Sequence, residues 1–151
     1  MRMWILLNML KMEIRIKKLV PEAVLPKKAH ASDAGFDLVA VSAGFEEGCW
    51  VCHTGLAFEI PEGYMGLVFP RSSIVRKDMS LANAVGVVDS NYRGEVTGRF
   101  RLAGMLEFPK YGVGERFAQM IIMPYPEVEF VESEELSETD RGAGGYGSTG
   151  K

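Results

Sequence analysis

The segment "EVTGRFRL", residues 95–102, decides the fold class. Its small and apolar residues alternate with polar ones; they are Val96, Gly98, Phe100 and Leu102. Successive side chains of a strand point to opposite faces, so this period of two predicts a half-buried strand. The same alternation recurs at residues 12–17 and 127–132, and two short apolar runs, "GYMGLVF" (63–69) and "FAQMIIM" (117–123), suit fully buried strands.

Turn signals rich in glycine separate these predicted strands. They are "PEG" (61–63), "DSNYRG" (89–94), "LAG" (102–104) and "YGVGE" (111–115). Helical periodicity nowhere exceeds about two turns, and "SSIVRK" (72–77) is the best helical candidate. Short strands punctuated in this way predict an all-β fold, a jelly-roll-like β-sandwich with one short helix at most.

Composition narrows the class of protein. The chain has 151 residues, of which 47% are hydrophobic and 25% charged, so we expect one domain with a substantial core. The net charge is −3, whereas a protein that coats a nucleic-acid backbone needs a basic face. We therefore expect no nucleic-acid partner, although a few arginines suffice for a small anion.

The cysteines do not form a recognisable chemical site. Cys49 and Cys52 make a single C-x-x-C inside a strand-like stretch, where a redox motif would open a helix. A zinc site needs about four ligands, and only His30 and His53 could join them. We interpret both as ordinary thiols, which suit a reducing, cytoplasmic environment.

The two ends of the sequence invite other readings. "MRMWILLNML" (1–10) has no small-residue cleavage site and is too short to span a membrane, so we expect residues 1–11 to be an extension outside the fold, with no membrane contact. "RGAGGYGSTGK" (141–151) resembles a phosphate-binding P-loop. The acidic "VESEELSETD" (131–140) before it is not strand-like, so a true P-loop is excluded. Residues 141–151 therefore form either a flexible arm or a segment that docks onto another surface.

Five stretches interrupt the strand pattern with polar or small residues. They are "ASDAGFDL" (31–38), "PRSSI" (70–74), "GVVDSNYRGEV" (86–96), "RFAQ" (116–119) and "RGAGGYGSTG" (141–150). Each alone has a structural interpretation: Asp37 could cap a turn and Arg71 could form a surface pair. Together, in this order, they are similar to the five motifs of the homotrimeric dUTPase family, which hydrolyses dUTP to dUMP and pyrophosphate. The similarity runs from about Met12 to Lys151.

The resemblance implies roles at the phosphates. Arg71, Ser72 and Ser73 would face the phosphates, with Gln119 as a further donor. Asp37 would hold Mg²⁺ through a bound water, and Mg²⁺ is the one cofactor implied. Asp89 would be the catalytic residue, accepting a proton from the water that attacks the α-phosphorus.

It also implies how base and sugar are selected and how the site closes. Uracil would lie between the two strands of a hairpin. The residues that would read the base and pack under the deoxyribose are Asn83, Val87, Val88, Thr97 and Tyr92. Residues 12–138 would form the β domain, and residues 139–151 a mobile lid contributed by another subunit of a homotrimer with shared sites. The lid residues that would contact dUTP are Arg141, Tyr146, Ser148 and Thr149.

Departures from the family pattern keep alternatives open. The segment "GRFRLAGMLEFPKYGVGER" (98–116) lacks an asparagine usual in the family and is about one residue longer. A dCTP deaminase-like enzyme would share the fold, but it needs a glutamate at the position of Arg99. Enzymes of that kind also lack a glycine-rich lid like residues 139–151. A non-catalytic, nucleotide-sensing trimer that controls a protein partner is the other alternative. The main expectation is an enzyme that keeps uracil out of DNA and supplies dUMP for dTMP synthesis.

Overall fold

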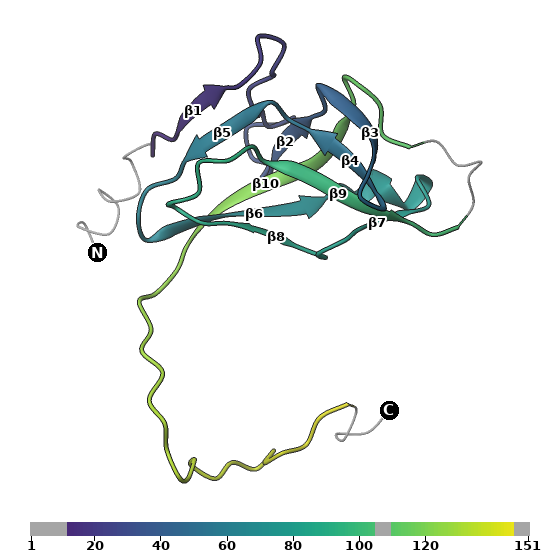
Figure 1. The fold of residues 1–151 in the computed structure, drawn as a ribbon. Coiled ribbons are helices and arrows are strands. Elements are labelled where there is room, and N and C mark those ends of the chain that lie inside the picture. Colours follow the sequence, from purple (N-terminus) through teal and green to yellow (C-terminus); the bar gives the residue numbers. More distant parts are fainter. Residues whose placement is uncertain (1–11, 105–109, 147–151) are drawn as a thin grey trace.

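The computed structural model describes residues 12–104 and 110–146, which form antiparallel sheets packed into a sandwich (Figure 1). One four-stranded sheet has the order β2 (Phe36–Val39), β10 (Arg116–Pro124), β6 (Tyr64–Pro70) and β8 (Gly86–Val88). The other four-stranded sheet has the order β3 (Ser42–Glu46), β4 (Cys49–His53), β9 (Thr97–Leu102) and β7 (Met79–Leu81). A two-stranded sheet pairs β1 (Arg15–Lys18) with β5 (Leu56–Glu59).

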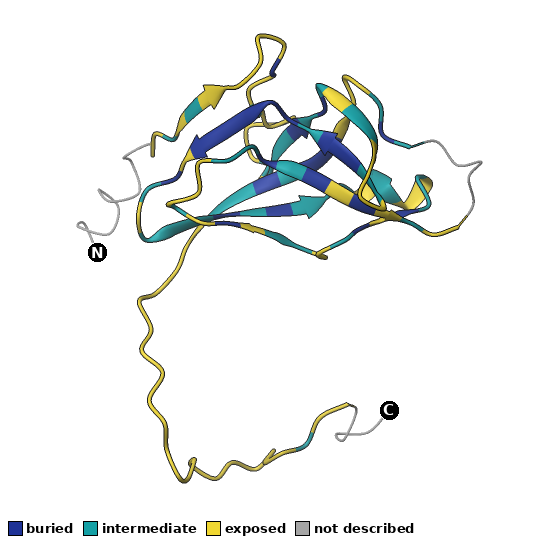
Figure 2. Cartoon of the chain, viewed as in Figure 1, coloured by how far each residue is buried: buried dark blue, intermediate teal, exposed yellow. Residues whose placement is uncertain are grey.

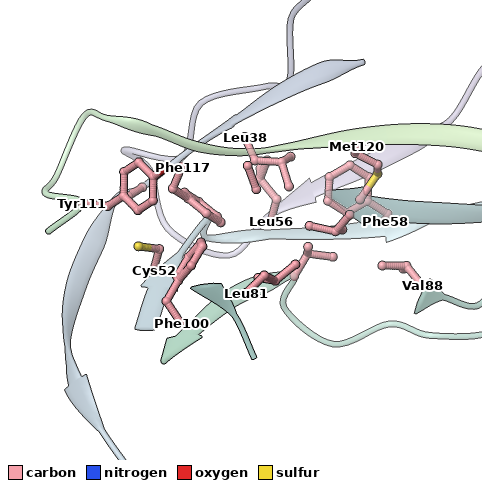
Figure 3. Close-up of a cluster of buried hydrophobic side chains, with 14 of the residues drawn as sticks. Leu38, Cys52, Leu56, Phe58, Leu81, Val88, Phe100, Tyr111, Phe117 and Met120 are labelled. Atoms are coloured by element: carbon pink, nitrogen blue, oxygen red, sulfur yellow. The ribbon is translucent and has the colours of Figure 1, made fainter. Parts of the chain in front are cut away.

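The core lies between the sheets, where the inward positions of the alternating strands meet (Figures 2 and 3). Phe100 of β9 is fully buried, and its ring centroid lies 5.3 Å from that of Tyr111 and 6.2 Å from that of Phe117. Gly98 keeps this aromatic cluster together, because a Cβ at that position would lie 2.5 Å from the Phe117 ring. The small residue in the alternating pattern is therefore a packing requirement.

The expected fold class is confirmed. The apolar runs at 63–69 and 117–123 become β6 and β10, the segment at 95–102 becomes β9, and residues 12–17 contribute β1. The one helical candidate forms a single 3₁₀ turn, η1 (Ser72–Arg76). Each four-stranded sheet buries one face, which explains the period of two.

One alternating segment forms no strand. Residues 127–132 have no ladder partner in the described chain, and Phe130 is 96% exposed. A period of two shows that a strand could bury one face, but a strand also needs a neighbouring edge to pair with. The segment instead belongs to an arm that leaves the sandwich after β10 (Figure 1).

The arm makes its contacts within itself. Tyr125 is the last point of attachment, where its N–H donates to the carbonyl of Gly63 at 3.0 Å. Beyond it, the hydrogen bonds of the described arm stay inside the arm, and Figure 2 shows it exposed along almost its whole length. Beyond Tyr125, the described part of the arm therefore gains no hydrogen-bond stabilisation from its own sandwich.

Candidate functional site

A first pocket, of about 190 Å³, opens between β8 and the start of β9. Six residues singled out in the sequence line it together: Asn83, Val87, Val88, Asp89, Tyr92 and Thr97. Val68, Leu81 and Val96 supply apolar lining. The pocket thus combines apolar lining with two carboxylates, those of Asp89 and Glu95, and the Tyr92 phenol, which suits a planar ring with a polar group beside it.

The strands on either side of this pocket do not pair with each other, so the expected hairpin is wrong. β8 pairs with β6, whereas β9 pairs with β4 and β7. Residues 89–96 therefore cross from one sheet to the other, which separates the strands and opens the pocket. β8 is the last strand of its sheet and has one unpaired edge, so its backbone N–H and C=O groups can bind a ligand.

The crossing segment is held by a tight turn. The Tyr92 N–H donates to the Asp89 carbonyl at 3.1 Å, and Arg93 Nη1 donates to the Ser90 carbonyl at 2.6 Å. A Cβ at Gly94 would collide with the Tyr92 ring, so glycine is what lets that ring lie against the backbone. The turn places Asp89 and Tyr92, both exposed, at the rim of the pocket.

A second pocket, of about 310 Å³, carries the charged residues. Its lining includes Asp37 of β2, Gln119 of β10, Arg71 just after β6, and Ser72, the first residue of η1. Ser73 follows in η1 and is half-buried, outside this lining. Gln119 Nε2 donates to the Pro70 carbonyl at 3.3 Å, so the amide is tied to the end of β6. Arginine, hydroxyl and amide donors together suit phosphate oxygens.

Asp37 lies between two arginines. Its Oδ1 is 2.8 Å from Arg71 Nε and its Oδ2 is 3.0 Å from Arg116 Nη1. A β-bulge between Arg116 and Ala118 interrupts the pairing of β10 with β2 beside this cluster. Arg116 had no role in the sequence-based prediction; its ion pair joins residues 79 apart, which no local pattern reveals.

The donor set around Asp37 fits Mg²⁺ only in company with a phosphate ligand. The described residues contain no group of three or more histidine, cysteine, aspartate or glutamate side chains placed to hold a metal. Mg²⁺ keeps several waters and takes its other ligands from substrate phosphates, so one carboxylate in a phosphate-binding pocket is enough. Asp37 is the residue that would hold it.

The two pockets share no lining residue within the described chain. Of the predicted lid residues, Arg141 and Tyr146 are exposed on the arm, away from both pockets, and Arg141 Nε donates to the Gly144 carbonyl at 2.9 Å. Ser148 and Thr149 lie outside the described residues. A single chain therefore presents three separate groups of candidate residues.

Sequence comparison identifies the family. The sequence model of the family described as dUTPase matches residues 21–150. The deoxyuridine 5'-triphosphate nucleotidohydrolase of Corynebacterium glutamicum is 40% identical over 148 residues, which cover 91% of this chain and 95% of that protein. The chain belongs to the dUTPase family.

Solved dUTPase structures share the fold. The Staphylococcus bacteriophage 80alpha dUTPase with dUPNHPP aligns with a TM-score of 0.80 and 26% identity, covering 92% of this chain and 99% of that one. A variant of the dUTPase from phage phi11 of S. aureus, described with a structural Mg(II) ion, aligns with a TM-score of 0.70 and 22% identity, covering 82% and 97%. The resemblance read from five motifs is confirmed as family membership.

Residues that suggested other classes lie elsewhere in this dUTPase fold. Arg99, at the position where a deaminase needs a glutamate, is outside the lining of the first pocket and pairs with Glu47 at 2.7 Å. Cys49 and Cys52 are free, and burial raises the pKa of the Cys52 thiol to about 12. That thiol is therefore not a nucleophile at neutral pH. The helices of the described chain are all too short or too polar to cross a membrane.

Proposed function

We propose that this member of the dUTPase family hydrolyses dUTP to dUMP and pyrophosphate in a Mg²⁺-dependent reaction. The observation that carries the proposal is the first pocket, where Asp89 stands at the rim of a slot lined by Asn83, Val87, Val88, Tyr92 and Thr97. The relative from C. glutamicum is named for the same activity. Removal of dUTP by this reaction would keep uracil out of DNA, and the dUMP released would be available for dTMP synthesis.

Selection of base and sugar follows from the walls of the pocket. Backbone groups of Val87, Val88 and Thr97 and the Asn83 amide would bind the polar edge of uracil. A Cβ at Gly86 would lie 3.2 Å from the Val68 Cβ, so a larger residue would crowd this wall of the pocket. A slot formed by backbone groups would leave no room for the methyl group of thymine. The Tyr92 ring would pack under the deoxyribose and clash with a ribose 2′-hydroxyl.

Asp89 is the proposed general base. Its exposed carboxylate would take a proton from a water molecule as the water oxygen bonds to the α-phosphorus. The bond from the α-phosphorus to its bridging oxygen then breaks, and pyrophosphate leaves with the electron pair. Water is a poor nucleophile at neutral pH, which is why this step needs a positioned base.

The second pocket would bind the triphosphate. Arg71, Ser72 and Gln119 line it, and Ser73 adjoins it in η1. Mg²⁺ bound beside Asp37 would neutralise phosphate charge in the transition state. Before the nucleotide binds, Arg71 and Arg116 hold the Asp37 carboxylate in position at this pocket.

A homotrimer with shared sites would bring the three groups together. The support is that, among residues 12–104 and 110–146, the two pockets have no lining residue in common and the arm makes no hydrogen bond to its own sandwich beyond Tyr125. The arm of a neighbour would close over the bound nucleotide with Arg141, Tyr146, Ser148 and Thr149 and exclude water. The alternating residues 127–132 would then find a partner on another subunit.

The free thiols support a reducing, cytoplasmic location.

The test is pyrophosphate release from dUTP, dTTP, dCTP and UTP with and without Mg²⁺. We expect release from dUTP alone, abolished by removal of Mg²⁺ with a chelator. Release of ammonia from dCTP would instead indicate a deaminase. Binding of dUTP without release would indicate a nucleotide-sensing protein.

A further inference from the structure

Among the described residues without an assigned role, a chain of polar contacts ends at the first pocket. His53, the last residue of β4, lies between two glutamates: its Nδ1 is 3.0 Å from Glu95 Oε2 and its Nε2 is 3.0 Å from Glu46 Oε1. Glu95 lines the pocket, and Glu46 ends β3 on the far side of β4. His53 therefore connects the middle of a sheet to the pocket wall.

Glu95 is fixed at three points. Besides His53 on Oε2, its Oε1 accepts a hydrogen bond from the Gly55 N–H at 2.7 Å. Its backbone carbonyl accepts a hydrogen bond from the Tyr92 hydroxyl at 3.0 Å. The carboxylate thus anchors the crossing segment to β4 and to the start of β5, and its carbonyl anchors the ring at the pocket rim.

We propose that His53 is a positioning residue for the sugar side of the pocket: by holding Glu95 it fixes the Tyr92 ring, and so sets the affinity for dUTP and the rejection of UTP. The proposal rests on the proposed function, because it assigns Tyr92 to the deoxyribose. His53 lines neither of the two pockets, so it acts only through Glu95.

The protonation state of His53 follows from the geometry. Both ring nitrogens face carboxylate oxygens, and only the imidazolium form can donate from both. The hydrogen bond to Glu95 raises the pKa of His53 above its ordinary value, burial opposes this, and Glu46 adds to the rise. The charged groups around the ring are Glu46 from β3 and Glu95 from the segment before β9, with Arg99 of β9 near Glu46.

The direction of the pH effect follows from that raised pKa. A group whose pKa is higher in the folded protein contributes its full effect below its unfolded pKa and loses it as the pH rises through the folded pKa. The neutral ring keeps one N–H and loses its charge, so even a ring that still donates to Glu95 makes a weaker hydrogen bond than the imidazolium does, and the hold on Glu95 weakens. We therefore expect the KM for dUTP to rise on the alkaline side of the His53 pKa.

The experiment compares His53→Gln with the parent enzyme as full-length chains. Because a hydrogen bond to a charged group is lost from a partly exposed site, we expect KM for dUTP to rise about three- to tenfold with kcat nearly unchanged. The ratio of kcat/KM for dUTP to that for UTP should fall, and the alkaline rise in KM should disappear. His30→Gln, which replaces the exposed second histidine, is the matched control and should keep the parent values.

If His53 had a purely structural role, its replacement would change the melting temperature or the oligomeric state. Melting temperature and oligomeric state, measured on the same samples, should stay close to those of the parent. If His53→Gln does not fold, Glu46→Gln serves instead: it leaves the Glu95 contact intact and should shift the alkaline rise in KM to lower pH. An unchanged KM profile and unchanged UTP rejection in the folded variant would overturn the proposal.

The failure of the proposed function can be told apart from the failure of this inference. If the parent releases no pyrophosphate from dUTP, the proposed function is wrong. If the parent is active and the variant matches it at every pH, only the role of His53 is wrong. Calorimetric binding of a non-hydrolysable dUTP analogue at acid and alkaline pH gives a readout independent of turnover, and a parent affinity that does not weaken with rising pH would also overturn the role of His53.

Discussion

Arg71 Nε lies 2.8 Å from Asp37 Oδ1, so the arginine proposed to bind phosphate is paired with the carboxylate proposed to hold Mg²⁺. The two side chains are 25% and 15% exposed, which makes this pair less screened than an ordinary surface pair. A triphosphate that arrives with Mg²⁺ brings both the anion for Arg71 and the cation for Asp37. Substrate binding would then exchange one internal ion pair for two external ones.

Replacing Asp37 with asparagine should therefore lower the affinity for Mg²⁺ more than the affinity for the nucleotide. A ligand that acts through bound water affects metal affinity by about 10–100-fold, so we expect the Mg²⁺ concentration for half-maximal activity to rise by that factor. The measurement is a Mg²⁺ titration of dUTP hydrolysis. Glu62→Gln, in the turn before β6, is the control and should leave the titration unchanged. An unaltered Mg²⁺ requirement in Asp37→Asn would remove Asp37 from the metal site.

Replacing Asp89 with asparagine should preserve the fold and the binding of dUTP while turnover falls. Loss of a general base typically lowers the rate by about 10²–10⁴-fold. Single-turnover hydrolysis separates this step from product release, and calorimetry with a non-hydrolysable analogue checks binding. Hydrolysis within a few-fold of the parent rate would show that another group takes the proton.

Replacing Gly98 with alanine should destabilise the sandwich. The new methyl group would meet the Phe117 and Phe100 rings, and overpacking of a core costs about 1–3 kcal/mol. The control is Gly44→Ala in β3, where an added Cβ meets nothing within 4 Å. Denaturant unfolding of both variants should show a loss of stability for Gly98→Ala alone. Equal stability of the two would mean that the aromatic cluster adjusts without cost.

Cutting the chain after Thr139 should leave a folded protein that still binds uracil nucleotides but barely turns over. The described arm makes no hydrogen bond to its own sandwich beyond Tyr125, so the melting temperature should hardly change. The cut removes Arg141, Tyr146, Ser148 and Thr149, and with them the closure over the phosphates.

Mixing truncated chains with full-length Asp89→Asn chains tests whether the lid is shared. Each chain alone would be nearly inactive, but a mixed trimer pairs an intact Asp89 with an intact lid. Activity should therefore return after subunit exchange, which labelled chains can verify. Verified exchange without activity would place the lid in its own subunit.

The sequence predicts those strands well that bury one face in the core of their own chain. The period of two at β9 and the apolar runs of β6 and β10 report which faces meet the core, and the structure confirms them. Residues 127–132 carry the same pattern without forming a strand in the described chain, because the pattern does not show whether a neighbouring edge is available to pair with it. β8 and β9 likewise read as a hairpin, although each finds its hydrogen bonds in a different sheet.

The site is predicted where its residues are close in sequence and missed where they are not. Asp89 and Tyr92 share one turn, so a single stretch contains both. His53 and Glu95 are 42 residues apart and meet only because β4 and β9 are neighbours. Glu95 reads in the sequence as an ordinary polar position of an alternating strand, and nothing local distinguishes it from a solvent-facing glutamate.

The described arm makes no hydrogen bond to its own sandwich beyond Tyr125, and this affects how the activity would respond to dilution of the protein. If each complete site draws on more than one chain, its formation follows mass action and its population falls as total protein falls. Specific activity would then drop at low enzyme concentration while every chain stays folded. An inhibitor of such an enzyme would not have to enter the nucleotide pocket. A molecule that binds the surface on which the neighbouring arm docks would prevent the arm from completing the site and so inhibit the enzyme.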